Sequence, residues 1–180
     1  MALLLVRHAN AGRRSAYKGD DRQRPLSPRG RERAIELVPL LGQYRPQRIL
    51  SSPFVRCCET VQPLAQALSL PVESLDELSE GHGADAVGLM RRMAGESAVL
   101  CTHGDVALEM AAALGMAVPG TNTDGPAPGG TASDGGAGSR SRRSGAVPRL
   151  QKGEVWVVQS AGTDLVVVEY LRRTGTAAPS

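Results

Sequence analysis

The sequence predicts an α/β fold with three layers, α/β/α, around a mostly parallel central sheet. Short aliphatic runs typical of buried strands alternate with longer segments that carry helical start signals and apolar faces. Polar, ionisable residues also follow four of these strands directly. In open parallel sheets, active sites lie beyond the carboxyl ends of the strands, so both observations point to the same architecture.

The first strand and the first helix have clear boundaries. Residues 2–6 form a continuous aliphatic run, the pattern of a strand buried on both faces. Ser27 and Pro28 provide a capping residue and a favourable first helical position. Ile35, Leu37, Val38, Leu40 and Leu41 give this helix an apolar face before Gly42 ends it. Pro39 is expected to kink this helix or to end it early.

The remaining elements continue the alternation. They are expected in this order: strand 48–50, helix to about residue 68 after Pro53, strand 71–75, helix 84–94, strand 98–101 and helix 106–114. Residues 154–159 and 165–170 predict a hairpin that closes the sheet. We expect residues 1–173 to form a single domain. It is interrupted by a flexible insertion, rich in Gly, Ala, Pro and Ser, at about 118–148. Residues 174–180 are expected to be a disordered tail.

Composition limits the class of protein without fixing its function. Aromatic residues make up only 3% of the 180-residue chain, so the core must be mainly aliphatic. The formal net charge of +3 suits an anionic substrate as well as a nucleic acid. The three cysteines form no CxxC pair and predict no disulfide framework. Residues 2–6 are too few for a membrane span and have no basic leader, so we expect a cytoplasmic protein without membrane contact.

Four strand ends are expected to deliver ionisable side chains to one edge of the sheet. Arg7 and His8 follow the first strand, and Arg56 lies soon after the second. Glu77 follows the third strand and His103 the fourth. This convergence predicts a site for an anionic group, because guanidinium groups are permanently charged, forked hydrogen-bond donors.

Three motifs resemble those of the histidine phosphatase superfamily, which includes phosphoglycerate mutases and SixA-type phosphohistidine phosphatases. They are Arg7-His8-Ala9, in which Ala9 replaces the usual glycine, Ser52 to Arg56, and Thr102-His103-Gly104. The resemblance implies a phosphoglycerate mutase-like fold. The short interval from Glu77 to His103 resembles the compact SixA-type branch. Arg56-Cys57 and Lys152-Gly153 are also similar to the phosphatase-like domain that follows the Nudix domain in some mycobacterial MutT-type hydrolases.

The resemblance implies that His8 is a nucleophile that becomes phosphorylated, with no metal and no cofactor. Arg7, Arg56 and His103 would bind the phosphoryl oxygens, consistent with the positioning and charge stabilisation that phosphoryl transfer requires. We expect a backbone carbonyl to hold one ring N–H of His8. We also expect the two arginines to lower the pKa of His8, which keeps the imidazole neutral.

Three further site residues are weaker candidates. Glu77 occupies the position of an acid that protonates the leaving oxygen in larger relatives, Glu80 is its rival, and a phosphohistidine substrate would need neither. Asn10 could bind a phosphate oxygen or cap its own loop. Arg24 could bind substrate at the pocket mouth or belong to a solvated basic loop.

Three function hypotheses follow from these residues. The first is a SixA-type phosphatase acting on phosphohistidine in a protein, and the second uses the same mechanism on nucleotides or other small phosphates. The third is a non-catalytic module that binds phosphate, or nucleic acid through the basic segment 140–149, which lacks the aromatic residues that base stacking favours. Only three dispersed histidines are present, so no metal site is expected. The sequence does not specify the oligomeric state.

Overall fold

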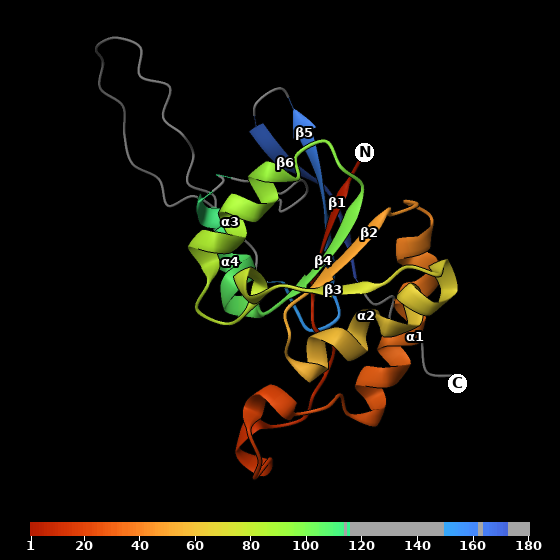
Figure 1. The fold of residues 1–180 in the computed structure, drawn as a ribbon, viewed down its shortest axis with the longest axis vertical. Coiled ribbons are helices and arrows are strands. Elements are labelled where there is room, and N and C mark those ends of the chain that lie inside the picture. The colour runs from red at the N-terminus through yellow and green to blue at the C-terminus, as the bar shows by residue number, and fades with distance from the viewer. Residues whose placement is uncertain (114, 116–149, 162–163, 173–180) are drawn as a thin grey trace, which may run out of the picture.

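A six-stranded sheet lies between two pairs of helices in the computed structural model, which describes residues 1–113, 115, 150–161 and 164–172 (Figure 1). The strands are β1 (Leu3–Arg7), β2 (Arg48–Ser51), β3 (Val72–Ser74), β4 (Ala98–Thr102), β5 (Val155–Ala161) and β6 (Asp164–Leu171). The α-helices are α1 (Pro28–Gly42), α2 (Val55–Leu68), α3 (Gly83–Arg92) and α4 (Gly104–Ala113), and three 3₁₀ turns are η1 (Arg14–Ala16), η2 (Asp21–Gln23) and η3 (Asp76–Leu78). The insertion expected at 118–148 and the tail expected at 174–180 lie outside the described residues.

The strand order is β3-β2-β4-β1-β5-β6, and the pairing is mostly parallel. β1 pairs in parallel with β4, and β2 pairs in parallel with both β4 and β3. β5 is antiparallel to β1 and to β6, so the hairpin predicted near the end of the chain is confirmed. The predicted fold class is therefore confirmed. The two antiparallel pairings, β1 with β5 and β5 with β6, lie toward one edge of the sheet.

Each face of the sheet has its own apolar core. Leu3 and Leu5 of β1 point to one face, which α3 and α4 cover, and the neighbouring Leu4 and Val6 point to the face that α1 and α2 cover (Figure 1). Because both faces are covered, these four side chains are all at most 2% exposed. This double burial is the reason why β1 is a continuous aliphatic run. None of the helices in the described ranges is long and apolar enough to cross a membrane.

α1 starts as predicted but does not end where its proline suggested. The Ser27 hydroxyl oxygen accepts a hydrogen bond from the Gly30 N–H at 3.2 Å, which caps the helix. Pro39 was expected to kink α1 or to end it early. The early end is wrong, because the helix continues to Gly42, the residue predicted to end it. A proline this close to the end removes one helical hydrogen bond, and the burial of Leu37 and Leu41 below it holds the last turn. Ile35, expected on the buried face, is 64% exposed.

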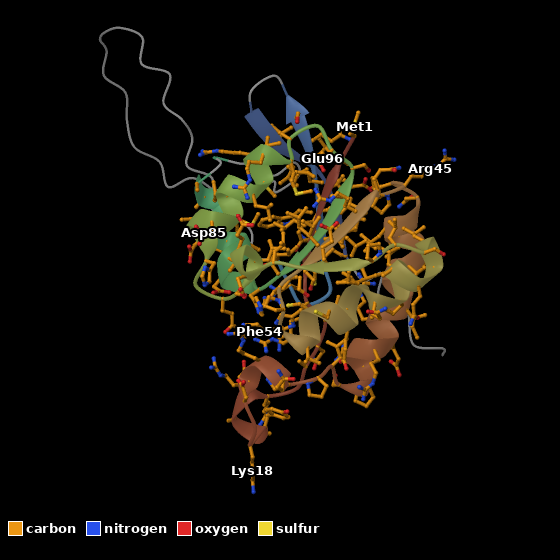
Figure 2. The ribbon with its side chains drawn as sticks, viewed as in Figure 1. Met1, Lys18, Arg45, Phe54, Asp85 and Glu96 are labelled. Atoms are coloured by element: carbon orange, nitrogen blue, oxygen red, sulfur yellow. The ribbon has the colours of Figure 1, made fainter. Side chains whose placement is uncertain are left out.

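The parallel strands β1, β2, β3 and β4 have their carboxyl ends at one end of the molecule. Figure 2 shows Met1, Arg45 and Glu96, which precede β1, β2 and β4, at the end opposite to Phe54, which follows β2. The residues that follow the three central strands are therefore neighbours in space.

Candidate active site

Sheet register brings the predicted motifs together. Arg7 of β1 lies opposite Thr102 of β4, and Ser51 of β2 lies opposite Cys101 of β4. The next residue along each strand is His8, His103 or Ser52. By this register His8 and His103 leave adjacent strands at the same level, and Ser52 lies one residue behind them. The rings of His8 and His103 meet edge to face, with centroids 5.3 Å apart.

His8 is buried, with 6% of its surface exposed. Its Nδ1 lies 2.8 Å from the Ala9 carbonyl oxygen. Because a carbonyl only accepts hydrogen bonds, Nδ1 carries the ring proton and Nε2 carries the lone pair. The expected backbone carbonyl partner is therefore confirmed, and the imidazole has the tautomer that a nucleophile at Nε2 requires.

The pKa of His8 is held well below its usual value near 6.5, mainly by burial. The hydrogen bond to Ala9 opposes this shift, while the charges of His103, Arg56 and Arg7 add to it. The expected direction is confirmed. The arginines are the smaller cause, since loss of solvation disfavours the charged ring more strongly.

Arg7 is fixed from two sides. Its Nη1 donates a hydrogen bond to the Leu150 carbonyl oxygen at 2.8 Å. Its guanidinium also lies so close to Gly104 that a Cβ there would be 2.6 Å from the Arg7 Cζ. The glycine after His103 is therefore needed for this position of Arg7.

Arg56 is fully buried at the start of α2 and is held by two acids. Its Nη1 donates to the Asp21 carbonyl oxygen at 2.7 Å and lies 3.1 Å from the Asp21 carboxylate. Its Nη2 donates to Glu80 Oε1 at 2.7 Å, and its Cζ lies 4.7 Å from the centroid of the Phe54 ring. A buried guanidinium with these partners has a fixed direction, as anion recognition requires.

His103 is 1% exposed and has a partner at each ring nitrogen. Nδ1 lies 3.2 Å from Glu80 Oε1, and Nε2 lies 2.9 Å from Ser52 Oγ. A carboxylate accepts only, so we assign the proton to Nδ1 and let the Ser52 hydroxyl donate to Nε2. The four motif residues Arg7, His8, Arg56 and His103 thus form one cluster.

The structure brings Glu80, and not Glu77, against this cluster. Glu77 Oε1 pairs with Arg92 Nη2 of α3 at 2.6 Å, and η3 instead turns Leu78 into the core. Glu80 contacts both Arg56 and His103. Glu80 was the rival candidate in the sequence, where position alone could not separate two acids three residues apart.

Asn10 and Arg24 both bind the protein's own loops. Asn10 Oδ1 accepts from the Gly12 N–H at 2.9 Å and from the Ser27 hydroxyl at 3.1 Å. Arg24 is 7% exposed, and its Nε donates to Asp21 Oδ1 at 2.7 Å. Sequence reasoning missed Asp21, whose pKa is lowered mainly by the hydrogen bond from Arg24. Asp21 therefore connects Arg24 to Arg56.

A basic cavity of about 300 Å³ adjoins the cluster at Arg7. Its lining residues are Arg7, Asn10, Arg29, Arg33, Gln151 and Lys152. Sequence reasoning assigned no binding role to the last four of these. The only signal for them was the Lys152-Gly153 step, because the others lie far apart along the chain.

Cys57 lies close to His103, with its Sγ 3.5 Å from the His103 Nε2. All three cysteines are free, as expected, and Cys57 and Cys101 are buried. Within the ranges that the structure describes, no group of three or more His, Cys, Asp or Glu side chains is arranged to hold a metal ion.

Comparison with known proteins identifies relatives of this chain. The model of the histidine phosphatase superfamily (branch 1) matches residues 3–98, more than half of the chain. An 8-oxo-(d)GTP phosphatase of Mycolicibacterium smegmatis is 42% identical over 110 residues, or 58% of this chain. The match covers 34% of that protein, so the chain spans about a third of its relative's length.

Solved structures share the fold over nearly the whole chain. The SixA protein of Agrobacterium tumefaciens has a TM-score of 0.67 at 20% identity, covering 95% of this chain and 97% of that one. A protein histidine phosphatase SixA complexed with tungstate has a TM-score of 0.67 at 19% identity, covering 95% of this chain and 96% of that one. At these identities the similarity establishes the phosphoglycerate mutase-like fold alone.

Proposed function

The chain belongs to the histidine phosphatase superfamily (branch 1), and on this premise we propose that it is a phosphatase with His8 as the nucleophile. The observation that carries the proposal is the buried, neutral His8, with its Nδ1 proton held by Ala9. Nε2 is then free to attack phosphorus. No metal is needed, because the nucleophile is already unprotonated at neutral pH.

The proposed reaction has two steps. His8 Nε2 attacks the phosphoryl group, the P–N bond forms, and the bond from phosphorus to the leaving oxygen breaks. Water then attacks phosphorus, the P–N bond breaks, and inorganic phosphate leaves. Arg7 and Arg56 stabilise the charge on the non-bridging oxygens in both steps. His103 contributes a third donor when its Nδ1–H exchanges Glu80 for a phosphoryl oxygen.

We assign the general acid to Glu80 rather than to Glu77. Glu80 contacts Arg56 and His103, and its side chain is 35% exposed, so it can exchange protons with solvent. As an acid it would protonate the leaving oxygen, and as a base it would accept the proton of the attacking water.

Two substrate classes have specific support. The short interval from Glu77 to His103 favours an open pocket and therefore a phosphohistidine protein, the first hypothesis from the sequence. The relative that is 42% identical over 110 residues acts on 8-oxo-(d)GTP, which favours a nucleotide. A cytoplasmic location fits both classes and is part of the proposal.

The test is to trap the phosphoenzyme. Brief incubation with a ³²P-labelled substrate, acid-free quenching and peptide mapping should place an acid-labile, base-stable label on His8. His8→Ala should lower turnover by several orders of magnitude while circular dichroism shows an intact fold, and EDTA should leave the wild-type rate unchanged. Label on another residue, or full activity in His8→Ala, would refute the proposal.

A further inference from the structure

The cavity beside Arg7 has a strong positive charge. Four of its six lining residues are cationic, Arg7, Arg29, Arg33 and Lys152, and the other two are the amides Asn10 and Gln151. No acid lines it. Its volume of about 300 Å³ lies at the lower end of the range for small-molecule sites, roughly 300–1,000 Å³.

Arg33 provides a buried donor with spare capacity in this cavity. The residue is 6% exposed; its Nε donates to the Gly153 carbonyl oxygen at 2.8 Å, and its Nη1 pairs with Glu36 at 3.1 Å. Its Nη2 is buried and has no hydrogen-bond partner among the described residues. A buried guanidinium nitrogen without an acceptor is costly, so this atom is a donor that an anionic ligand could satisfy.

The turn that carries Lys152 is fixed to both sides of the cavity. The Gly153 N–H donates to the Arg7 carbonyl oxygen at 3.0 Å, and the Gly153 carbonyl accepts from Arg33. Gly153 has φ +75°, and a Cβ there would lie 2.7 Å from Arg33 Cγ, so only glycine allows this approach. The turn therefore holds Lys152 next to a glycine that is bonded to both Arg7 and Arg33.

Lys152 also lies within range of the charges of the catalytic cluster. Partial burial lowers the pKa of its ammonium group, although the residue as a whole is exposed. Three guanidinium charges act in the same direction: Arg7, Arg24 and Arg56. Arg7 and Arg56 also lower the pKa of His8, so Lys152 and His8 share the same positive surroundings.

We propose that this cavity is a second phosphate subsite, in which Arg29, Arg33 and Lys152 bind the phosphate adjacent to the one transferred to His8. The substrate is then a polyphosphate, such as a nucleoside di- or triphosphate. Arg7 lines both sites and so spans the two neighbouring phosphates. The N-terminal turn of α1, where Arg29 lies, adds a favourable dipole. The assignment rests on the proposed function of His8 and names the substrate class.

The test compares one phosphate with several on an inactive protein. Calorimetric titration of His8→Ala with orthophosphate and tripolyphosphate should show that tripolyphosphate binds about tenfold more tightly, or better. Lys152→Ala and Arg29→Ala, each combined with His8→Ala, should remove most of this difference. Arg31→Ala is the matched control, because Arg31 is exposed on the same helix and does not line the cavity.

Kinetics provide the second measurement. In an otherwise wild-type protein, Lys152→Ala should lower kcat/KM about tenfold for dGTP and clearly less for p-nitrophenyl phosphate, which has one phosphate. Equal affinities for orthophosphate and tripolyphosphate, or equal losses from Lys152→Ala and Arg31→Ala, would overturn the subsite. Hydrolysis of a phosphohistidine protein but of no polyphosphate would also overturn it and leave the role of His8 intact. That role would be contradicted by activity in His8→Ala or by phosphoenzyme label on another residue.

Discussion

At the scale of single residues, the site depends on an imidazole that burial keeps neutral among positive charges. His8 lies beside two guanidinium groups, and protonation would add a third positive charge in a place with little water. One of these guanidinium groups, that of Arg56, is held by the acids Asp21 and Glu80. A phosphoryl group would supply the negative charge that this arrangement lacks at its centre.

The first prediction at this scale concerns pH. In the unfolded chain His8 regains its usual pKa near 6.5, while the folded pKa is well below it. Below about pH 6.5 the unfolded state therefore binds a proton that the folded state does not. The free energy of unfolding should decrease as the pH is lowered, by at most about 1.4 kcal/mol per pH unit. Urea unfolding from pH 7.5 to 5 measures this slope.

Two variants isolate the contribution of His8. His8→Asn should flatten the slope between pH 6.5 and 5, because the titrating group is gone. His82→Asn should retain the wild-type slope, since it leaves His8 buried. Identical slopes in wild type and His8→Asn would show that burial of His8 does not control this pH dependence.

The second prediction at this scale separates the two glutamates. Glu80→Gln should lower kcat about a hundredfold for an alkyl phosphate, whose leaving oxygen needs a proton, and much less for p-nitrophenyl phosphate. Glu77→Gln should change either rate less than Glu80→Gln does, because Glu77 pairs with Arg92. The opposite ranking of the two variants would return the acid role to Glu77.

At the scale of secondary-structure elements, close approaches between elements position the site. Gly30 in α1 lies against the loop after β1, and a Cβ there would be 2.0 Å from the Asn10 carbonyl oxygen. Gly104 at the start of α4 lies against the Arg7 side chain. The Gly30 contact is with backbone atoms, which move little to admit a Cβ. The Gly104 contact is with the end of the Arg7 side chain, which can move aside.

This difference gives a prediction for α4. Gly104→Ala should push the Arg7 guanidinium aside and lower kcat/KM by about tenfold to a hundredfold, because small displacements of a positioning group are costly. The melting temperature should change little, within about 2 °C. Gly42→Ala is the control, with no atom within 4 Å of the added Cβ. Full activity in Gly104→Ala, or parallel losses of stability and activity, would contradict this account.

At the scale of the whole molecule, the sheet order places β4 between β2 and β1, although it follows both in the chain. Three motifs that are distant in sequence consequently lie at the carboxyl ends of three adjacent strands. α1 and α2 pack on one face and α3 and α4 on the other, so each strand is held by two cores. Such a sheet is a rigid support for side chains that must meet at one point.

Local patterns are enough to predict the order of the elements, the buried strands and the motif residues Arg7, His8, Arg56 and His103. These patterns are aliphatic runs, helix caps and the short motifs at strand ends. They predict that α1 ends at Gly42, but not that the helix continues through Pro39 or where Ile35 points, because packing against α2 and the sheet decides both.

Only the tertiary structure decided which acid faces the pocket. Glu77 and Glu80 are alike in sequence, but Arg92 attracts one, and Arg56 and His103 attract the other. Only the fold brought Arg33 of α1 and Lys152 before β5 to one cavity. The physical reason is that charge pairing and burial depend on residues distant along the chain, whereas a local pattern reports only on its neighbours.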